Sequence, residues 1–333
     1  MRRLPKFTGL IILTFLLLGL TMVGSSSDLE KVTMMLDWVP NTNHTGIYVA
    51  LDKGWYKEQG LKVKVVEPGG NTAVEKVVGT GKAAFGISFQ EFATPAISMG
   101  VPIVSVAAIV QENTSGFVSI AEKGMTRPRD YTGKEYGGWG MPIEKEIIKT
   151  LVNGDGGDFS TVDFINIGKG DLLTMLSQGK FDFAWMYYGW QGIEAQLRDI
   201  ELNWVMLNDY KNLIPNYYTP IIISSRSFLD KNPDIAESFM HATARGYKFA
   251  IENPGEAAEI LLKHTPEADP QLVNKSQQWL SPRYRDEAPY WGYQEKAVWE
   301  NFGKWMLEHG LIEKEFAAEQ AFTNEFLPQN TQE

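Results

Sequence analysis

The chain has 333 residues, no cysteine and a formal net charge of −10. Without cysteine it can form no disulfide, no thiolate nucleophile and no cysteine-based metal site. The acidic balance argues against nucleic acid or anionic lipid as the main partner, while 10 Trp, 13 Tyr and 17 Phe supply both core and stacking surface.

The first 27 residues predict export. A basic head with Arg2, Arg3 and Lys6 precedes "LIILTFLLLGLTMV" (10–23), an apolar run too short for a membrane span, and small residues follow. We therefore expect a signal peptide over 1–27 and an exported protein, in the periplasm or at the outer face of the cell membrane. Ser25 stands where a bacterial lipoprotein would carry its anchor cysteine, so a lipid-anchored version with cysteine at that position stays open. Removing three cations and no acid leaves 28 basic against 41 acidic residues.

The next hundred residues alternate strand-like and helical patterns. Strands are expected at 31–38, 61–68, 82–88 and 101–110, and helices at 44–59 (ended by Gly60) and 71–81. Strand, helix and strand at this spacing indicate βαβ units and a largely parallel sheet.

The pattern then restarts, with strands expected at 134–140, 162–168 and 180–188 and helices at 142–154 and 171–179. "GTGKAAFGIS" in the first half matches "LSQGKFDFAWM" in the second, because in each a helix ends at glycine, lysine follows and an apolar strand begins. This predicts two α/β lobes in tandem: lobe one at 31–122 plus 222–328, and lobe two at 125–219. Helices follow from 226 and are expected to pack on lobe one. "GDGGD" (154–158) lacks the downstream glutamate of a calcium loop and is expected to end a helix.

No catalytic centre is visible in the sequence. The four histidines (His44, His241, His264 and His309) lack metal-ligand spacing, and no GxSxG motif, P-loop or dinucleotide fingerprint occurs. We expect no catalytic residue, no metal and no cofactor.

Aromatic and polar residues instead gather where strands end, which is where ligands bind in open α/β sheets. The candidates are Asp37 and Trp38, Ser88 with the following Phe89, Gln90 and Glu91, Trp139, the Tyr187–Tyr188 pair with Trp190, and Tyr217. An indole beside a carboxylate suits a flat nitrogen-bearing ring, because the indole stacks on its face and the acid accepts hydrogen bonds from its amino groups. Alternatives stay open: Trp38 could pack between the lobes, Asp37 could cap the next helix, His44 could merely start that helix, and Glu194 could be a solvated helix residue.

"LDWVPNTNHTGIYVALDKGWYKEQGL" (36–61) and "GGNTAVEKVVGTGKAAFGI" (69–87) resemble the extracytoplasmic solute-binding proteins of ABC importers, over nearly the whole mature chain. Within them the chain is most similar to the thiamin-pyrimidine (ThiY-type) branch. The resemblance implies a two-lobed periplasmic-binding-protein fold, type II-like, with mixed sheets flanked by helices. It also implies an interlobe cleft that binds formylaminopyrimidine or hydroxymethylpyrimidine, and docking on a membrane permease. Other cargo, such as riboflavin, an alkylsulfonate or nitrate, stays an alternative.

The branch is also similar to a fungal enzyme that makes hydroxymethylpyrimidine phosphate from pyridoxal phosphate and a histidine. Against that pattern the cofactor lysine falls near Ser88, the donated histidine near Phe92, and the cysteine-rich segment at "IPNYYT" (214–219), so none of the required groups is present. The residues that still match the pattern of the fungal enzyme are Trp38, His44 and Glu194. The resemblance implies an aromatic sandwich of Trp38 against Tyr188. The residues expected to bind the ligand are Asp37, Trp38, His44, Ser88, Trp139, Tyr188, Glu194 and Tyr217.

Overall fold

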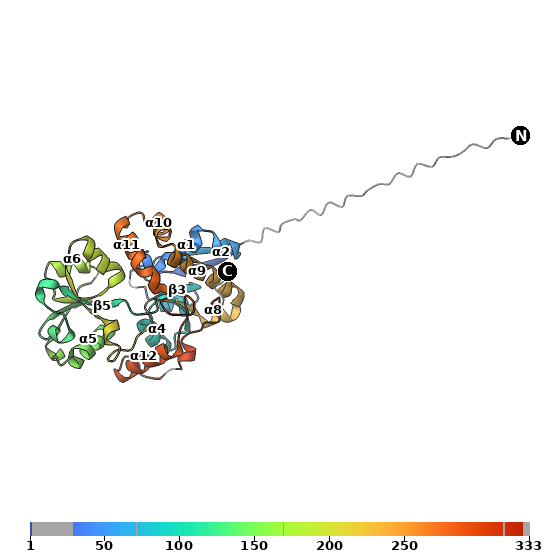
Figure 1. Cartoon of the computed structure of the whole chain (residues 1–333). Helices are drawn as coiled ribbons and strands as arrows, with labels where there is room; N and C mark the ends of the chain where they lie inside the picture. The colour runs from blue at the N-terminus through green and yellow to red at the C-terminus, as the bar shows by residue number, and fades with distance from the viewer. Residues whose placement is uncertain (2–28, 71, 169, 316, 329–333) are drawn as a thin grey trace.

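The computed structural model describes Met1 and residues 29–70, 72–168, 170–315 and 317–328. The predicted signal peptide, beyond Met1, lies outside the described residues. The described chain folds into two α/β lobes, seen side by side in Figure 1.

The first sheet has the strand order β2-β1-β3-β10-β4. Its strands are β1 (Glu30–Met35), β2 (Leu61–Val66), β3 (Phe85–Ser88), β4 (Ile103–Ala108) and β10 (Ile221–Ser225). β1 runs parallel to β2 and β3, whereas β10 is antiparallel to both of its neighbours. The sheet is therefore mixed, with one reversed strand in the fourth place.

The second sheet repeats this design with the order β7-β6-β8-β5-β9. Its strands are β5 (Ser115–Ile120), β6 (Glu135–Gly138), β7 (Asp163–Asn166), β8 (Phe183–Tyr187) and β9 (Leu202–Met206). β6 is parallel to β7 and β8, and β5 is antiparallel to β8 and β9. The predicted fold class, two α/β lobes with mixed sheets flanked by helices, is confirmed.

The first lobe boundary lies earlier than the sequence analysis placed it. β5 pairs with β8 and β9, so residues 115–122, assigned above to lobe one, belong with the second sheet. The chain crosses between the lobes at 109–114 and returns at 207–220. β5 and β9 were both missed, because each is a short strand whose partners are distant in sequence.

Twelve α-helices are described, besides short 3-10 and π-helical segments. Nine of them lie in the parts of the chain that form lobe one, before β5 and after β10. They are α1 (Thr45–Asp52), α2 (Trp55–Glu58), α3 (Val74–Gly79), α4 (Gln90–Ser98), α8 (Arg226–Lys231), α9 (Pro233–Glu252), α10 (Pro254–His264), α11 (Pro270–Leu280) and α12 (Lys296–Glu308). Lobe two carries α5 (Pro142–Gly154), α6 (Leu172–Ser177) and α7 (Ile193–Leu197). The single helix expected at 44–59 is divided, because Gly54 adopts φ +77 between α1 and α2.

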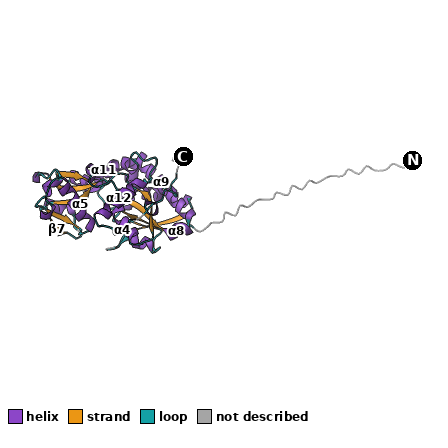
Figure 2. Cartoon of the chain, turned by 90° about the horizontal axis from the view of Figure 1, so that it is seen from below, coloured by secondary structure: helices purple, strands orange, loops and turns teal. Residues whose placement is uncertain are grey.

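The C-terminal helices do more than cover lobe one. Trp299 of α12 is buried in a lobe-one cluster, while Phe302 and Trp305 of the same helix belong to the main core of lobe two. Phe302 stacks on Tyr217 at a ring separation of 4.2 Å. α11 and α12 therefore lie at the boundary between the lobes, as both views show (Figures 1 and 2).

Close helix packing in lobe one depends on two glycines that face each other. A Cβ added to Gly246 of α9 would lie 1.9 Å from the carbonyl oxygen of Gly46 in α1. We expect Gly246→Ala to destabilise the protein by about 3 kcal/mol, because the clash is with backbone and forces the helices apart. Urea unfolding measures this. Gly255→Ala in α10, where an added Cβ meets nothing within 4 Å, is the matched control, and equal stability of the two variants would contradict the packing argument.

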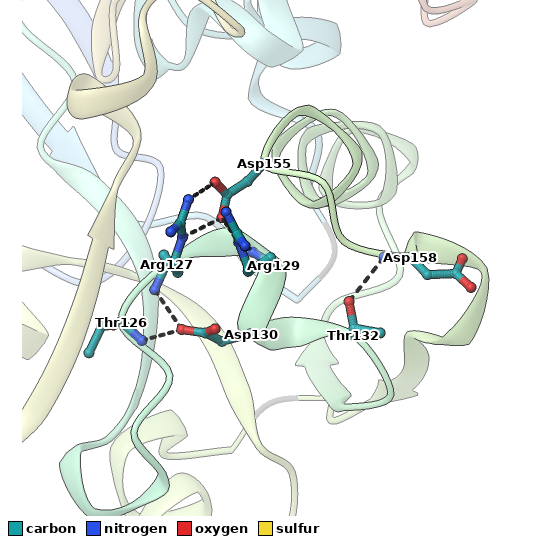
Figure 3. Close-up of polar contacts among 7 residues, drawn as sticks. All are labelled: Thr126, Arg127, Arg129, Asp130, Thr132, Asp155 and Asp158. Atoms are coloured by element: carbon teal, nitrogen blue, oxygen red, sulfur yellow. Dashed lines mark hydrogen bonds and ion pairs between the residues drawn. The ribbon is translucent and has the colours of Figure 1, made fainter.

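The acidic "GDGGD" segment ends α5, as expected. Asp155 is the C-cap residue of that helix, and its carboxylate accepts hydrogen bonds from the Arg127 side chain and the Arg129 backbone (Figure 3). These contacts, led by the Arg127 hydrogen bond, hold the pKa of Asp155 far below its ordinary value. The Asp158 N–H donates to Thr132 Oγ1 at 3.0 Å. These contacts join the segment to residues 127–132 of lobe two.

Within the described ranges, no helix has the length and apolar character needed to cross a membrane.

Candidate functional site

A small cavity lies between the lobes, at the carboxyl ends of both sheets. It is lined by Asn41, Thr42, Asn43, Thr114, Tyr187, Gly189, Trp190, Thr219 and Leu280. None of these side chains is charged. The cavity measures about 20 Å³, room for about one water molecule, so a ring-sized ligand can enter only if the lobes separate.

The lobe-one wall is a turn held by buried hydrogen bonds. Asn41 is the N-cap of the 3-10 segment Thr42–His44, and its N–H donates to His44 Nδ1 at 3.1 Å. Since Nδ1 is the acceptor, the ring proton is on Nε2, which donates to Asp37 Oδ1 at 2.7 Å. His44 is fully buried and Asp37 nearly so. Asn41, rather than Asp37, is the cap, and His44 fixes the orientation of the Asp37 carboxylate.

Trp38 and Trp139 occupy corresponding places in the two lobes. Trp38 comes shortly after β1, and Trp139 follows β6, the strand with the same position in the second sheet. Their exposed fractions are 51% and 44%. Neither lines the interlobe cavity, and the exposure of Trp38 argues against the alternative that it packs between the lobes.

The adjacent tyrosines at the end of β8 have different surroundings. Tyr187 lines the interlobe cavity and stacks against Phe89, at the end of β3, with ring centroids 6.5 Å apart. Tyr188 instead packs against Trp204 and Trp279 and accepts a hydrogen bond from Gln196 at 2.9 Å.

Tyr188 also lines a pocket of about 540 Å³ whose lining comes from lobe two alone. The structure therefore does not bring Tyr188 into a sandwich with Trp38. Its neighbour Tyr187, the last residue of β8, lies in the interlobe wall instead, whereas Tyr188 is the first residue of the following π-helical segment. The sequence shows two consecutive tyrosines but not which of them faces the cleft.

Three further candidates lie away from the cavity lining. Ser88 is buried and donates a hydrogen bond to Glu75 of α3. Tyr217 is buried against Phe302. Glu194 forms an ion pair with Arg198 at 3.1 Å along α7, the solvated-helix alternative considered above.

Glu91, in the first turn of α4, is not among the residues that the sequence analysis expected to bind the ligand. It is 3% exposed, its Oε1 accepts a hydrogen bond from Thr219 Oγ1 at 3.3 Å, and its Oε2 has no hydrogen-bond partner. Burial raises the pKa of this carboxyl to about 8, an effect that the Thr219 hydrogen bond opposes and the Glu75 charge reinforces. The position after a strand was the signal in the sequence, but burial could be known only from the fold.

Carboxylates from both lobes converge on Tyr187. Burial raises the pKa of its hydroxyl far above the ordinary value, and the charges of Glu91, Asp37 and Glu144 raise it further. Glu144 of α5 is itself buried and accepts the backbone N–H of Trp139 at 3.1 Å. The site thus combines aromatic rings, neutral hydrogen-bonding groups and acids.

A hydrogen-bond chain joins the lobes at this cavity. The Ser276 hydroxyl of α11 donates to the Gly189 carbonyl of lobe two, so Thr42 Oγ1 donates to Ser276 Oγ at 2.6 Å. Gly189 lies in a π-helical segment, Tyr188–Gly192, a feature often found at functional sites. This chain holds the lobes together in the observed arrangement.

Among the described residues of the site, Ser88 and His44 are not arranged as a nucleophile and its base. Ser88 pairs with an acid rather than a histidine, and His44 uses both ring nitrogens in structural hydrogen bonds. Among the described residues, no group of three His, Cys, Asp or Glu is placed to hold a metal ion. The aromatic rings of the site can stack on a planar molecule, and its polar groups can form hydrogen bonds with the edge of that molecule.

Comparison with known proteins finds relatives of two kinds, a binding protein and a synthase. The chain is 28% identical to a formylaminopyrimidine-binding protein of Halalkalibacterium halodurans over 325 residues, covering 94% of this chain and 97% of the relative. It is 26% identical to a 4-amino-5-hydroxymethyl-2-methylpyrimidine phosphate synthase of Legionella pneumophila, covering 92% and 95%.

Among solved structures, the periplasmic nitrate-binding protein NrtA from Synechocystis PCC 6803 matches with a TM-score of 0.69 at 12% identity, covering 90% of this chain and 87% of that one. This likeness concerns the fold alone. The model of the family described as NMT1/THI5 like matches residues 41–257, more than half of the chain, and the chain therefore belongs to the NMT1/THI5-like family.

Proposed function

We propose that the protein is the substrate-binding component of an ABC importer and captures a thiamin pyrimidine precursor, formylaminopyrimidine or hydroxymethylpyrimidine. The observation that carries the proposal is the composition of the interlobe site. Tyr187 and Trp190 present aromatic faces, and asparagine and threonine side chains present uncharged hydrogen-bonding groups. The formylaminopyrimidine-binding relative supports the same cargo class.

A small anion is the poorer cargo for this site. Nitrate or an alkylsulfonate would need cations or several convergent N–H donors. No lysine or arginine belongs to the cavity lining, and the ionisable groups that act on Tyr187 are the acids Glu91, Asp37 and Glu144. These features favour a ring that carries amino groups.

A synthase reaction is also disfavoured. The positions where the similar fungal enzyme places its cofactor lysine and donated histidine hold Ser88 and Phe92, and "IPNYYT" has no cysteine. Ser88 cannot form a Schiff base with pyridoxal phosphate. The protein is proposed to bind its ligand without chemical change.

Capture then follows from the fold. The lobes separate about the two crossovers at 109–114 and 207–220, admit the ring, and close on it. Asp37, oriented by His44, accepts hydrogen bonds from amino groups. Tyr187 offers a stacking face from the cavity lining, and Trp38, which lies outside the lining of the closed cavity, offers one from lobe one once the lobes have separated. The closed form would dock on a membrane permease, with the protein exported and the permease and ATPase on separate chains. Nucleic acid is not expected as a partner.

A ligand-dependent thermal shift tests the proposal. Hydroxymethylpyrimidine at a hundred times its Kd should stabilise the protein by about 2.7 kcal/mol, without turnover. Trp38→Ala should keep the fold, since the ring is half exposed, and bind at least about fivefold more weakly through lost stacking. Nitrate is the matched control ligand. A shift with nitrate and none with any aminopyrimidine would contradict the assignment.

A further inference from the structure

Glu91 occupies the boundary between the lobes without touching the cavity directly. It lies in the first turn of α4, shortly after β3, and its neighbour Phe92 packs against the core of lobe two. Thr219 lines the cavity, and its hydroxyl donates to Glu91 Oε1. Glu91 therefore lies behind the cavity wall, one hydrogen bond away from it.

Among the described residues, no cation pairs with Glu91 to balance an ionised carboxylate. The titratable groups that face it are Glu75 of α3, Tyr187 of β8 and Tyr217 of the returning crossover. A buried carboxyl group in such a place is far more stable when neutral.

Thr219 links this acid to the ligand-facing tyrosine. Its hydroxyl donates to Glu91 Oε1, and Thr219 and Tyr187 both line the interlobe cavity. Thr219 belongs to the crossover, Tyr187 to lobe two and Glu91 to lobe one, so the three meet only when the lobes are closed. An ionised Glu91 would instead favour water entering this boundary.

We propose that Glu91 is a positioning residue of the interlobe site, whose neutral carboxyl group anchors Thr219 beside Tyr187 when the lobes close, so that ligand capture requires the Glu91 proton. The proposal rests on the proposed function for its cargo and adds a proton to the binding equilibrium. Glutamine has nearly the same shape as a protonated glutamate and stays neutral at every pH, so it should hold Thr219 in the same way. The Glu91→Gln variant therefore keeps the packing of the side chain and removes its titration.

The first measurement is the Kd for hydroxymethylpyrimidine by calorimetry at pH 7 and pH 9, for wild type and Glu91→Gln. With a carboxyl pKa of about 8, the wild-type to variant Kd ratio should rise about tenfold over this range. The ratio cancels any titration of the ligand and of the other site residues. Glu259→Gln, on an exposed position of α10, should follow wild type. A constant ratio would overturn the proposal.

The second measurement needs no ligand and compares urea unfolding of the two proteins from pH 5 to pH 8. Because the folded-state pKa lies above the ordinary 4.5, the protonated form stabilises the fold fully below pH 4.5, and the advantage is lost as pH rises toward 8. Wild type should lose stability relative to Glu91→Gln across this window, and parallel curves would overturn the proposal. If wild type bound no pyrimidine at any pH, the proposed cargo would fail, and this comparison would still decide whether Glu91 carries the proton.

Discussion

Tyr187→Leu is expected to weaken pyrimidine binding by about two orders of magnitude, whereas Tyr188→Leu should leave the affinity within a few-fold of wild type. Tyr187 lines the interlobe cavity and its ring faces Phe89. Losing a stacking face costs about 1 kcal/mol or more, and losing a buried hydroxyl contact costs a similar amount or somewhat more. Together these correspond to about a hundredfold in Kd.

The neighbouring tyrosine makes this a matched comparison, because the two substitutions are chemically identical and one residue apart. Tyr188 packs on Trp204 and Trp279, so its loss should appear in unfolding rather than in affinity. Isothermal calorimetry gives the Kd, and urea unfolding checks that both variants are folded. The reverse result, with Tyr188→Leu the damaging change, would place the ligand in the pocket of lobe two instead of the interlobe site.

His44→Leu is expected to cost about 3 kcal/mol in the free energy of unfolding and most of the affinity for ligand. The fully buried ring accepts from the Asn41 N–H and donates to Asp37. Leucine would leave a buried donor and a buried carboxylate without these partners, and each loss costs about 1–3 kcal/mol. Urea unfolding measures the stability, and calorimetry measures the binding.

His241→Leu serves as the control for that change. His241 is 38% exposed and lies 3.7 Å from Glu237, a surface pair worth little. It should cost under about 1 kcal/mol. If His44→Leu proved as stable as His241→Leu, the Asp37–His44–Asn41 hydrogen bonds would not organise the turn, and the assigned orientation of Asp37 would be wrong.

Local pattern was sufficient for much of the fold. The helix expected at 142–154 is α5 (Pro142–Gly154), and the glycine–lysine–strand repeat correctly indicated two similar lobes. Such signals depend on residues near each other in sequence, such as capping groups and periodic apolar positions. β5 was missed because its place is set by pairing with β8 and β9 across 60 or more residues.

The candidate site was also predictable only where local sequence pattern was sufficient. Residues at strand ends were identified as a class, and Asp37 with His44 does form a connected, buried pair. Of two adjacent tyrosines, however, the expected one faces Trp204, and Glu194 pairs with Arg198. Tyr187 ends β8 and Tyr188 begins the next segment, and which of the two side chains faces the cleft depends on what each packs against in the folded protein.

By itself, the sequence determined the class of architecture, the lack of cysteine chemistry and the aromatic, acidic character of the strand ends, since these follow from composition and short-range periodicity. Only the tertiary structure decided that Tyr187 lines the cavity, that α12 belongs to both cores and that Glu91 is buried with no ion-pair partner among the described residues. The reason is that burial and partner choice are set by segments that meet from distant parts of the chain. A carboxyl group's protonation follows from that environment rather than from its own identity.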